Sequence, residues 1–149
     1  MRHAEEPSDP KNPDLAVEGR LRADRLAIFV PVQFGEPDFV FAASPNKMSV
    51  RAFLTMRPLS FAIQERIDTS FKANKNLTLA THLFSNSIYA GKLVVICWTH
   101  SEIPALANVL NARRRDYPDP WDETIFNLIF QFDYGRRENP ATTKVVQPF

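Results

Sequence analysis

Two arginines and two histidines carry the clearest chemistry of this 149-residue chain. Arg2 and His3 are adjacent near the first residue, His100 follows an apolar run, and Arg51 lies between them in the sequence. A neutral imidazole can attack phosphorus, and guanidinium groups match the oxygens of a phosphate as paired donors. These residue types predict phosphoryl chemistry, with His3 as the nucleophile and Arg2, Arg51 and His100 as the groups that bind the phosphate.

Phosphoryl transfer also needs an acid for the leaving oxygen. Glu102 follows His100 by two residues and opens a predicted helix. We expect Glu102 to donate this proton if its surroundings raise its pKa. Lys47 lies in a loop after a predicted strand, where it either adds positive charge to the substrate-binding site or is solvated.

The composition narrows the classes of partner. A net charge of +1 provides no overall field for nucleic acid or a membrane surface, so we expect neither as a partner. Four glycines form no phosphate-binding loop, and three separated histidines with one cysteine show no metal-ligand spacing, so we expect no cofactor and no metal. Cys97 lies within an apolar run and is expected to be a buried, inert thiol.

The length and the hydrophobic fraction of 44% are those of one globular domain, here residues 1–149. No apolar run approaches the ~20 residues that span a bilayer, and the polar N-terminal segment is unlike a signal peptide. We therefore expect a cytoplasmic protein. Nothing in the sequence indicates the oligomeric state.

Helices and strands alternate along most of the predicted structure. Apolar spacing predicts helices, and continuous apolar runs between prolines or turns predict strands. Pro58 is expected to kink or split the second helix, and residues 31–37 are predicted to be a connector. The predicted helices cover residues 15–29, 49 to beyond 58, 76–84 and 102–112, and the predicted strands cover 38–43, 67–71, 93–98, 125–134 and, at an edge, 144–149.

This order predicts right-handed crossovers and a largely parallel sheet. Ligands bind at the carboxyl ends of the strands in such sheets. His3, the 44–47 loop and His100 would meet at that edge. Gly19 lies inside the first helix, where glycine costs about 1 kcal/mol, so we expect it to allow a close approach by neighbouring backbone.

Four blocks of the sequence, in order, resemble the histidine phosphatase superfamily, also called phosphoglycerate mutase-like. The first block is similar to the Arg-His signature of that superfamily, the second to a glycine-containing helix, the third to its Ser-Pro and Arg-Ala segment, and the fourth to the strand that presents its second histidine. The blocks are Arg2-His3-Ala4-Glu5, Leu15 to Ala23, Ala43-Ser44-Pro45 with Arg51-Ala52 and Thr55, and Ile96 to His100.

The resemblance implies a three-layer α/β/α fold with a mostly parallel sheet. It implies that His3 becomes phosphorylated, that Arg2, Arg51 and His100 form the phosphate pocket, and that Glu102 is the proton donor, with Glu5 in reserve. The implied function is hydrolysis of a phosphate monoester, whose substrate is a small phosphorylated molecule or a phosphoprotein.

The main departure from the superfamily is at the start of the chain. Several apolar residues precede the Arg-His pair in the superfamily, whereas Met1 alone precedes it here. We therefore expect either that the first strand has been truncated or that the true start of the protein lies upstream of Met1. Two other hypotheses therefore stand beside the phosphatase. One is a catalytically degenerate member that binds a phosphorylated ligand or partner without turnover, and the other is a truncated, marginally folded product.

Overall fold

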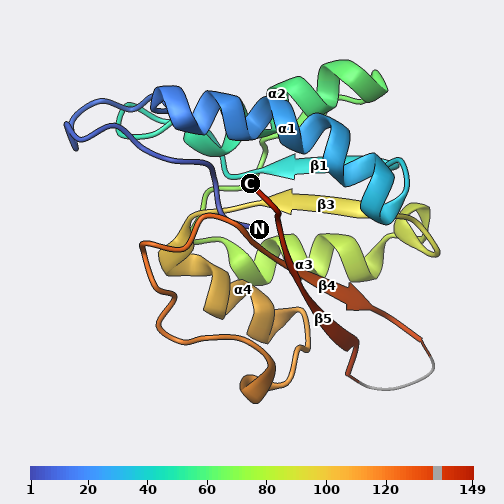
Figure 1. The fold of residues 1–149 in the computed structure, drawn as a ribbon. Helices are drawn as coiled ribbons and strands as arrows, with labels where there is room; N and C mark the ends of the chain where they lie inside the picture. The colour runs from blue at the N-terminus through green and yellow to red at the C-terminus, as the bar shows by residue number, and fades with distance from the viewer. Residues whose placement is uncertain (136–138) are drawn as a thin grey trace.

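A three-stranded parallel sheet lies at the centre of the computed structural model, which describes residues 1–135 and 139–149 (Figure 1). β1 (Phe39–Ala42) lies between β2 (Ile67–Asp68) and β3 (Val94–Cys97). Within this sheet Val40 pairs with Ile67 on one side and with Val95 on the other. The apolar run of β1 is buried from Val40 to Ala42, which confirms the predicted strand covered on both faces.

Helices cover both faces of this sheet and form a three-layer α/β/α arrangement (Figure 1). α1 (Val17–Phe34) and α2 (Arg51–Ile63) pack against each other on one face. α3 (Asn76–Ser85) and α4 (Ile103–Val109) pack together on the other face. Short 3₁₀ turns at 87–89, 100–102 and 114–116 connect the remaining elements.

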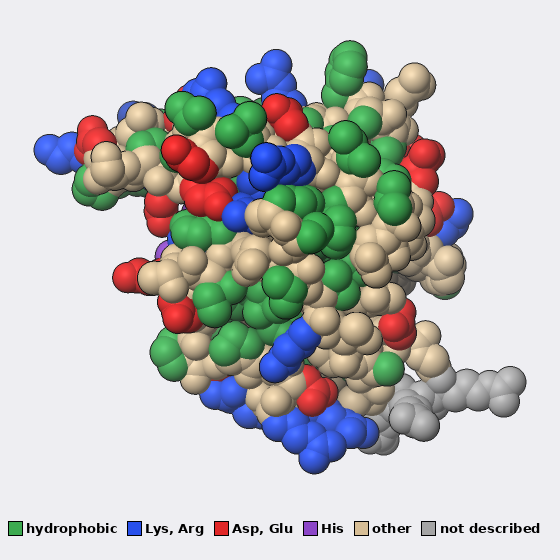
Figure 2. All heavy atoms as spheres, in the orientation of Figure 1, with side chains coloured by type: hydrophobic (Ala, Val, Ile, Leu, Met, Phe, Trp, Pro, Cys, Tyr) green, Lys and Arg blue, Asp and Glu red, His purple; other side chains and the backbone are tan. Residues whose placement is uncertain are grey.

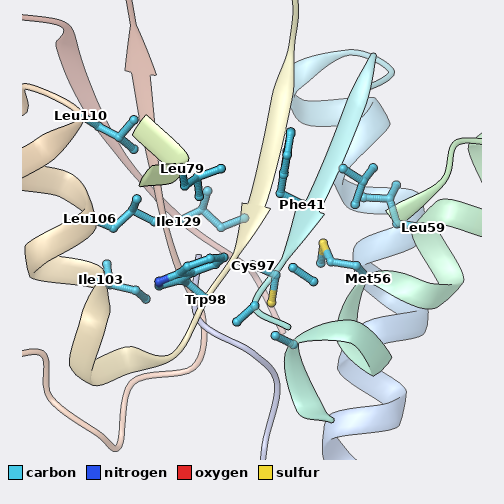
Figure 3. Close-up of a cluster of buried hydrophobic side chains, with 14 of the residues drawn as sticks. Phe41, Met56, Leu59, Leu79, Cys97, Trp98, Ile103, Leu106, Leu110 and Ile129 are labelled. Carbon is cyan, nitrogen blue, oxygen red and sulfur yellow. The ribbon is translucent and has the colours of Figure 1, made fainter. Parts of the chain in front are cut away.

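The hydrophobic core continues through all three layers. Figure 3 shows Phe41 and Cys97 of the sheet with Met56 and Leu59 on one side and Leu79 on the other. Each of these side chains is at most 2% exposed, and burying one of the large ones contributes about 1.5–3 kcal/mol. The sheet is therefore held from both faces and provides a rigid support for the loops at its edge.

Two prolines lie inside helices, which contradicts the connector predicted to begin at Pro31 and, of the two alternatives given for Pro58, the split helix. α2 is one helix across Pro58, and α1 continues through Pro31 to Phe34, so the connector predicted at 31–37 was wrong over its first half. An internal proline costs a helix about 3 kcal/mol. In α2, complete burial of Met56 and Leu59 on either side of Pro58 compensates for that cost.

The last two strands form a separate antiparallel hairpin. β4 (Leu128–Asp133) pairs with β5 (Ala141–Val146), with Leu128 opposite Val146, so the parallel sheet excludes these strands. The turn predicted at 135–142 lies partly outside the described residues. Phe130 packs against Trp121 and the core, so the hairpin, at the lower right of Figure 1, covers part of the hydrophobic core. Among the described residues, no helix has the length and hydropathy to cross a membrane.

Candidate active site

The first residues of the chain form a short segment beside β3. The Trp98 amide donates to the Met1 carbonyl at 2.9 Å, and the His3 amide donates to the Trp98 carbonyl at 3.1 Å. These bonds make Arg2 a parallel bridge partner of Trp98. Parallel pairing brings His3 to the carboxyl end of the sheet, where it is only 3% exposed.

The ring of His3 is fixed in one tautomer. Its Nδ1 lies 2.8 Å from the carbonyl oxygen of Ala4. Because a carbonyl only accepts hydrogen bonds, Nδ1 carries the proton, and Nε2 of the neutral ring keeps its lone pair. The pKa of His3 is lowered to about 4, chiefly by burial and also by the charges of Arg2 and Arg51, against the opposing effects of the Ala4 bond and the Glu6 charge. His3 is therefore neutral at neutral pH.

His100 faces His3 across the site. Their ring centroids are 6.4 Å apart with an interplanar angle of 69°. His100 begins the 3₁₀ turn after β3, and its Nδ1 is buried without a hydrogen-bond partner among the described residues. Burial lowers the pKa of His100, and the charge of Arg2 lowers it further. Both imidazoles are thus held in an environment that disfavours their charged forms.

Arg2 is enclosed on all sides. Its side chain is 0% exposed, and its Nη2 lies 3.0 Å from Oε1 of Glu6. Nη1 donates to the Glu123 carbonyl, and the guanidinium carbon lies 3.7 Å from the centroid of the Phe126 ring. Its Nε has no hydrogen-bond partner among the described residues. Arg2 therefore has a donor left to offer, although its guanidinium plane is already covered.

Arg51 is the first residue of α2 and points back toward the N-terminal segment. Nε donates to the Asp14 carbonyl at 3.1 Å, and Nη2 donates to the Asn12 carbonyl at 2.6 Å. Nη1 lies 2.9 Å from Oε2 of Glu6. The loop before α1 and the first turn of α2 thus fix the direction of this guanidinium.

Glu6 is the residue that sequence reasoning missed. Its two carboxylate oxygens bridge the guanidinium groups of Arg2 and Arg51. Consecutive side chains of an extended chain point to opposite sides. Glu5 turns toward α1, where Arg22 Nε donates to both of its oxygens at 2.8 and 3.0 Å, and Glu6 consequently turns toward the arginines. The Glu-Glu doublet directly after the Arg-His pair was the available signal.

Not every predicted site residue joins this cluster. The carboxylate of Glu102 accepts a bond from the Asn76 amide at 2.7 Å. Glu5 is held by Arg22, and Lys47 is exposed in its loop. Glu123 was not predicted, yet its charge acts on both Arg2 and His100. The structure therefore brings together Arg2, His3, Arg51 and His100, and it provides Glu6 and Glu123 as nearby acids.

Two further contacts fix the N-terminal segment. Thr55 of α2 accepts from the Ala4 amide at 2.9 Å and donates to the Arg51 carbonyl at 2.8 Å, which couples the histidine segment to the arginine. A Cβ at Gly19 would lie 2.4 Å from the Glu5 carbonyl oxygen. The close backbone approach predicted for Gly19 is confirmed.

Cys97 and His82 lie apart from the site. Burial raises the pKa of the Cys97 thiol to about 12, consistent with an inert core residue. His82 Nε2 lies 2.8 Å from the Tyr89 hydroxyl within an aromatic cluster. Across residues 1–135 and 139–149, no group of three metal-ligating side chains stands close enough to hold an ion.

Comparisons with known proteins agree with this geometry at the level of the fold. No protein-family model and no curated protein matches the sequence. The structure is similar to that of a mycobacterial glucosyl-3-phosphoglycerate phosphatase, solved in complex with inorganic phosphate, with a TM-score of 0.56 and 14% identity over 98% of this chain and 93% of that chain. That phosphatase is a member of the histidine phosphatase superfamily. The chain thus has the phosphoglycerate mutase-like α/β fold that its sequence predicted.

Proposed function

We propose that this protein hydrolyses phosphate monoesters through a phosphohistidine on His3. The observation that carries the proposal is the Nδ1 bond to Ala4, which leaves Nε2 as a free nucleophile beside Arg2 and Arg51. The structural neighbour is itself a phosphatase, which is consistent with the assignment. The substrate would be a small phosphorylated molecule or a phosphoprotein.

The proposed reaction has two steps. Nε2 of His3 attacks phosphorus and the ester P–O bond breaks, so the alcohol leaves with a proton from an acid. Water then attacks the phosphohistidine, giving inorganic phosphate and free His3. Arg2 and Arg51, with His100 donating a hydrogen bond from the N–H of its neutral ring, would stabilise the charge on the phosphoryl oxygens in both steps.

Two carboxylates compete for the role of proton donor. Glu102 is the predicted donor but is bonded to Asn76, whereas Glu6 lies against the arginines. A poor leaving group depends more on an acid than p-nitrophenolate does. Hydrolysis of an alkyl phosphate and of p-nitrophenyl phosphate should therefore be compared in Glu102→Gln and Glu6→Gln. The proton donor is the residue whose variant slows hydrolysis of the alkyl phosphate far more than that of p-nitrophenyl phosphate.

The first test is turnover of p-nitrophenyl phosphate. His3→Ala should abolish it, whereas His82→Gln, which changes a histidine outside the site, should not. Protein stopped during turnover should carry an acid-labile, alkali-stable phosphate on His3 by mass spectrometry. Equal rates in the wild type and His3→Ala would exclude the phosphohistidine route.

A binding protein without turnover is the second candidate. It is favoured by Glu6, which already holds both arginines, and by the low exposure of His3. Glu6 must leave before phosphate can occupy both guanidinium groups. Glu6→Gln removes a competing charge and should tighten binding of inorganic phosphate about tenfold, because a charged hydrogen bond contributes about 1.5–3 kcal/mol.

The matched control is Glu65→Gln, which changes an exposed carboxylate two residues beyond the end of α2. Phosphate affinity should be unchanged in this variant. Phosphate binding without hydrolysis in the wild type and in Glu6→Gln would favour the binding protein. Unchanged or weaker phosphate binding in Glu6→Gln would contradict the role given to Glu6.

A further inference from the structure

The outer face of α1 carries a stripe of apolar side chains. Successive spacings of four, seven and four residues keep them on one side of the helix. The stripe consists of Val17, Leu21, Ile28 and Val32. These side chains are 53–82% exposed, whereas Ala23, Leu26 and Val30 on the inner face are buried. Apolar residues on opposite faces are typical of a helix that is covered from both sides.

One charged pair interrupts the stripe at its midpoint. Asp24 is seven residues from Val17, Arg25 is seven residues from Val32, and both charged side chains are exposed. Among the described residues neither of them forms a salt bridge. The view in Figure 2 shows hydrophobic side chains over α1 with acidic and basic groups among them. The centre of the stripe thus presents one positive and one negative charge to solvent.

The position of this pair makes the stripe complementary to itself. In a two-fold dimer the same patch of each subunit faces the other. Because the pair lies at the midpoint, Asp24 and Arg25 of one copy meet those of the other whether the two helices run parallel or antiparallel. The four charges then sum to zero, and each lies beside a charge of the opposite sign. The apolar residues on either side of the pair pack against one another.

We propose that two copies of this protein associate through the outer faces of their α1 helices. Burial of the apolar stripe would drive the association, and the pair of Asp24 and Arg25 would make it selective for a second copy. The stripe is about 22 Å long at ~1.5 Å per residue. A single helix pair of this length gives a small interface, so we expect a micromolar dissociation constant. The proposal does not depend on catalysis by His3.

A membrane surface fits this face less well. Helices that lie in a membrane interface are rich in lysine and arginine on their polar side. Among the exposed charged residues of α1, Glu18 and Asp24 balance Arg20 and Arg25. Arg20 is also paired, because its Nη2 lies 2.7 Å from Oδ2 of Asp14. A partner of uniform charge would likewise be repelled by one member of the central pair.

The first test is the oligomeric state of the full chain. Sedimentation velocity from micromolar to millimolar concentration should show a reversible equilibrium between monomer and dimer. Ile28→Glu places a charge within the stripe and should weaken dimerisation at least about tenfold. The matched control is Leu77→Glu, which changes a residue that is 67% exposed on α3, in the other helical layer, and should dimerise like the wild type. Far-UV circular dichroism verifies that both variants fold.

Charge exchange tests the second copy directly. Asp24→Lys makes the centre of the stripe basic and Arg25→Glu makes it acidic, so each variant alone should dimerise about tenfold more weakly than the wild type. An equimolar mixture of the two variants should form heterodimers, because a basic centre then meets an acidic one. The chain that carries both substitutions is the control and should dimerise like the wild type. High salt should reduce the preference for the heterodimer.

Three results would overturn the proposal. The first is a wild-type chain that stays monomeric up to millimolar concentration. The second is a dimer that Ile28→Glu weakens no more than Leu77→Glu does, which would place the interface elsewhere. The third is a mixture of Asp24→Lys and Arg25→Glu that associates no more strongly than either variant alone, which would show that the central charges of the two copies do not meet.

Discussion

Gly19→Ala tests whether the backbone contact beneath the site holds the N-terminal segment. An alanine Cβ would lie 2.4 Å from the Glu5 carbonyl oxygen and 3.0 Å from the Glu5 amide nitrogen. Both are backbone atoms, so no side-chain rotation removes the clash. Ordinary contact begins near 3.4 Å, so α1 and the Glu5 segment must separate by nearly 1 Å.

Two opposing effects determine the magnitude. Alanine in place of glycine inside a helix contributes about 1 kcal/mol of stability. Against this, the separation stretches the 2.9 Å bond from the Ala16 amide to the Glu5 carbonyl and disturbs the pairing of Glu5 with Arg22. Overpacking typically costs about 1–3 kcal/mol, and because both clashing atoms are backbone we take the upper part of that range, about 2–3 kcal/mol. We expect a net loss of about 1–2 kcal/mol in the free energy of unfolding, which lowers Tm by about 2–8 °C for a chain of this size.

The measurement is urea and thermal unfolding of Gly19→Ala beside Gly135→Ala. A Cβ at Gly135 would meet no described atom within 4 Å, and this residue has no positive φ, so its alanine variant should be as stable as the wild type. Phosphate affinity is a second readout, because Glu5 is two residues from His3. Wild-type or greater stability of Gly19→Ala would refute the close approach and the positioning of His3 that depends on it.

Two further predictions concern the same segment. The pKa of His3 is lowered from 6.5 to about 4 in the folded protein. As the pH falls, His3 therefore takes up a proton in the unfolded chain before it does so in the folded protein. The contribution of His3 to the free energy of unfolding is complete above pH 6.5 and is lost as the pH falls toward 4. In urea unfolding, the contribution of His3 to the free energy of unfolding should be about 2 kcal/mol smaller at pH 5 than at pH 8. This difference should disappear in His3→Asn. An unaltered pH dependence of stability in that variant would count against the buried neutral ring. Thr55→Val leaves the Ala4 amide and the Arg51 carbonyl without their shared hydrogen-bond partner. This change should lower the free energy of unfolding by about 1–3 kcal/mol, whereas Thr55→Ser should keep most of that stability. Equal stability of the two variants would show that the hydroxyl is unimportant.

The central strands and the main candidate site residues were predictable from local pattern. The 38–43 and 93–98 runs are continuous and apolar, and a strand covered on both faces requires that composition. Parallel strands end at one edge of the sheet, so His3 and His100 were expected to meet. The role of Gly19 was predictable because glycine destabilises a helix, and a close backbone contact that excludes a Cβ explains its presence there.

The helical prolines could not be predicted in the same way. Local rules end a helix near Pro31 or Pro58, but burial of residues far apart in the sequence outweighs the local cost. The pairing of β4 with β5 could not be predicted for a similar reason. Their apolar residues pack against the core as a separate hairpin, and the same residues could also have been buried as strands of the parallel sheet. Only tertiary packing distinguishes these two arrangements.

Residue types and their order thus determine the α/β fold class and the set of candidate phosphate-binding side chains. Tertiary structure decides the direction of each charged group: Glu5 faces Arg22, Glu6 faces Arg2 and Arg51, and Glu102 faces Asn76. The physical reason is that hydrophobic pattern acts locally along the chain, whereas charge pairing and strand neighbours depend on segments that meet only after folding.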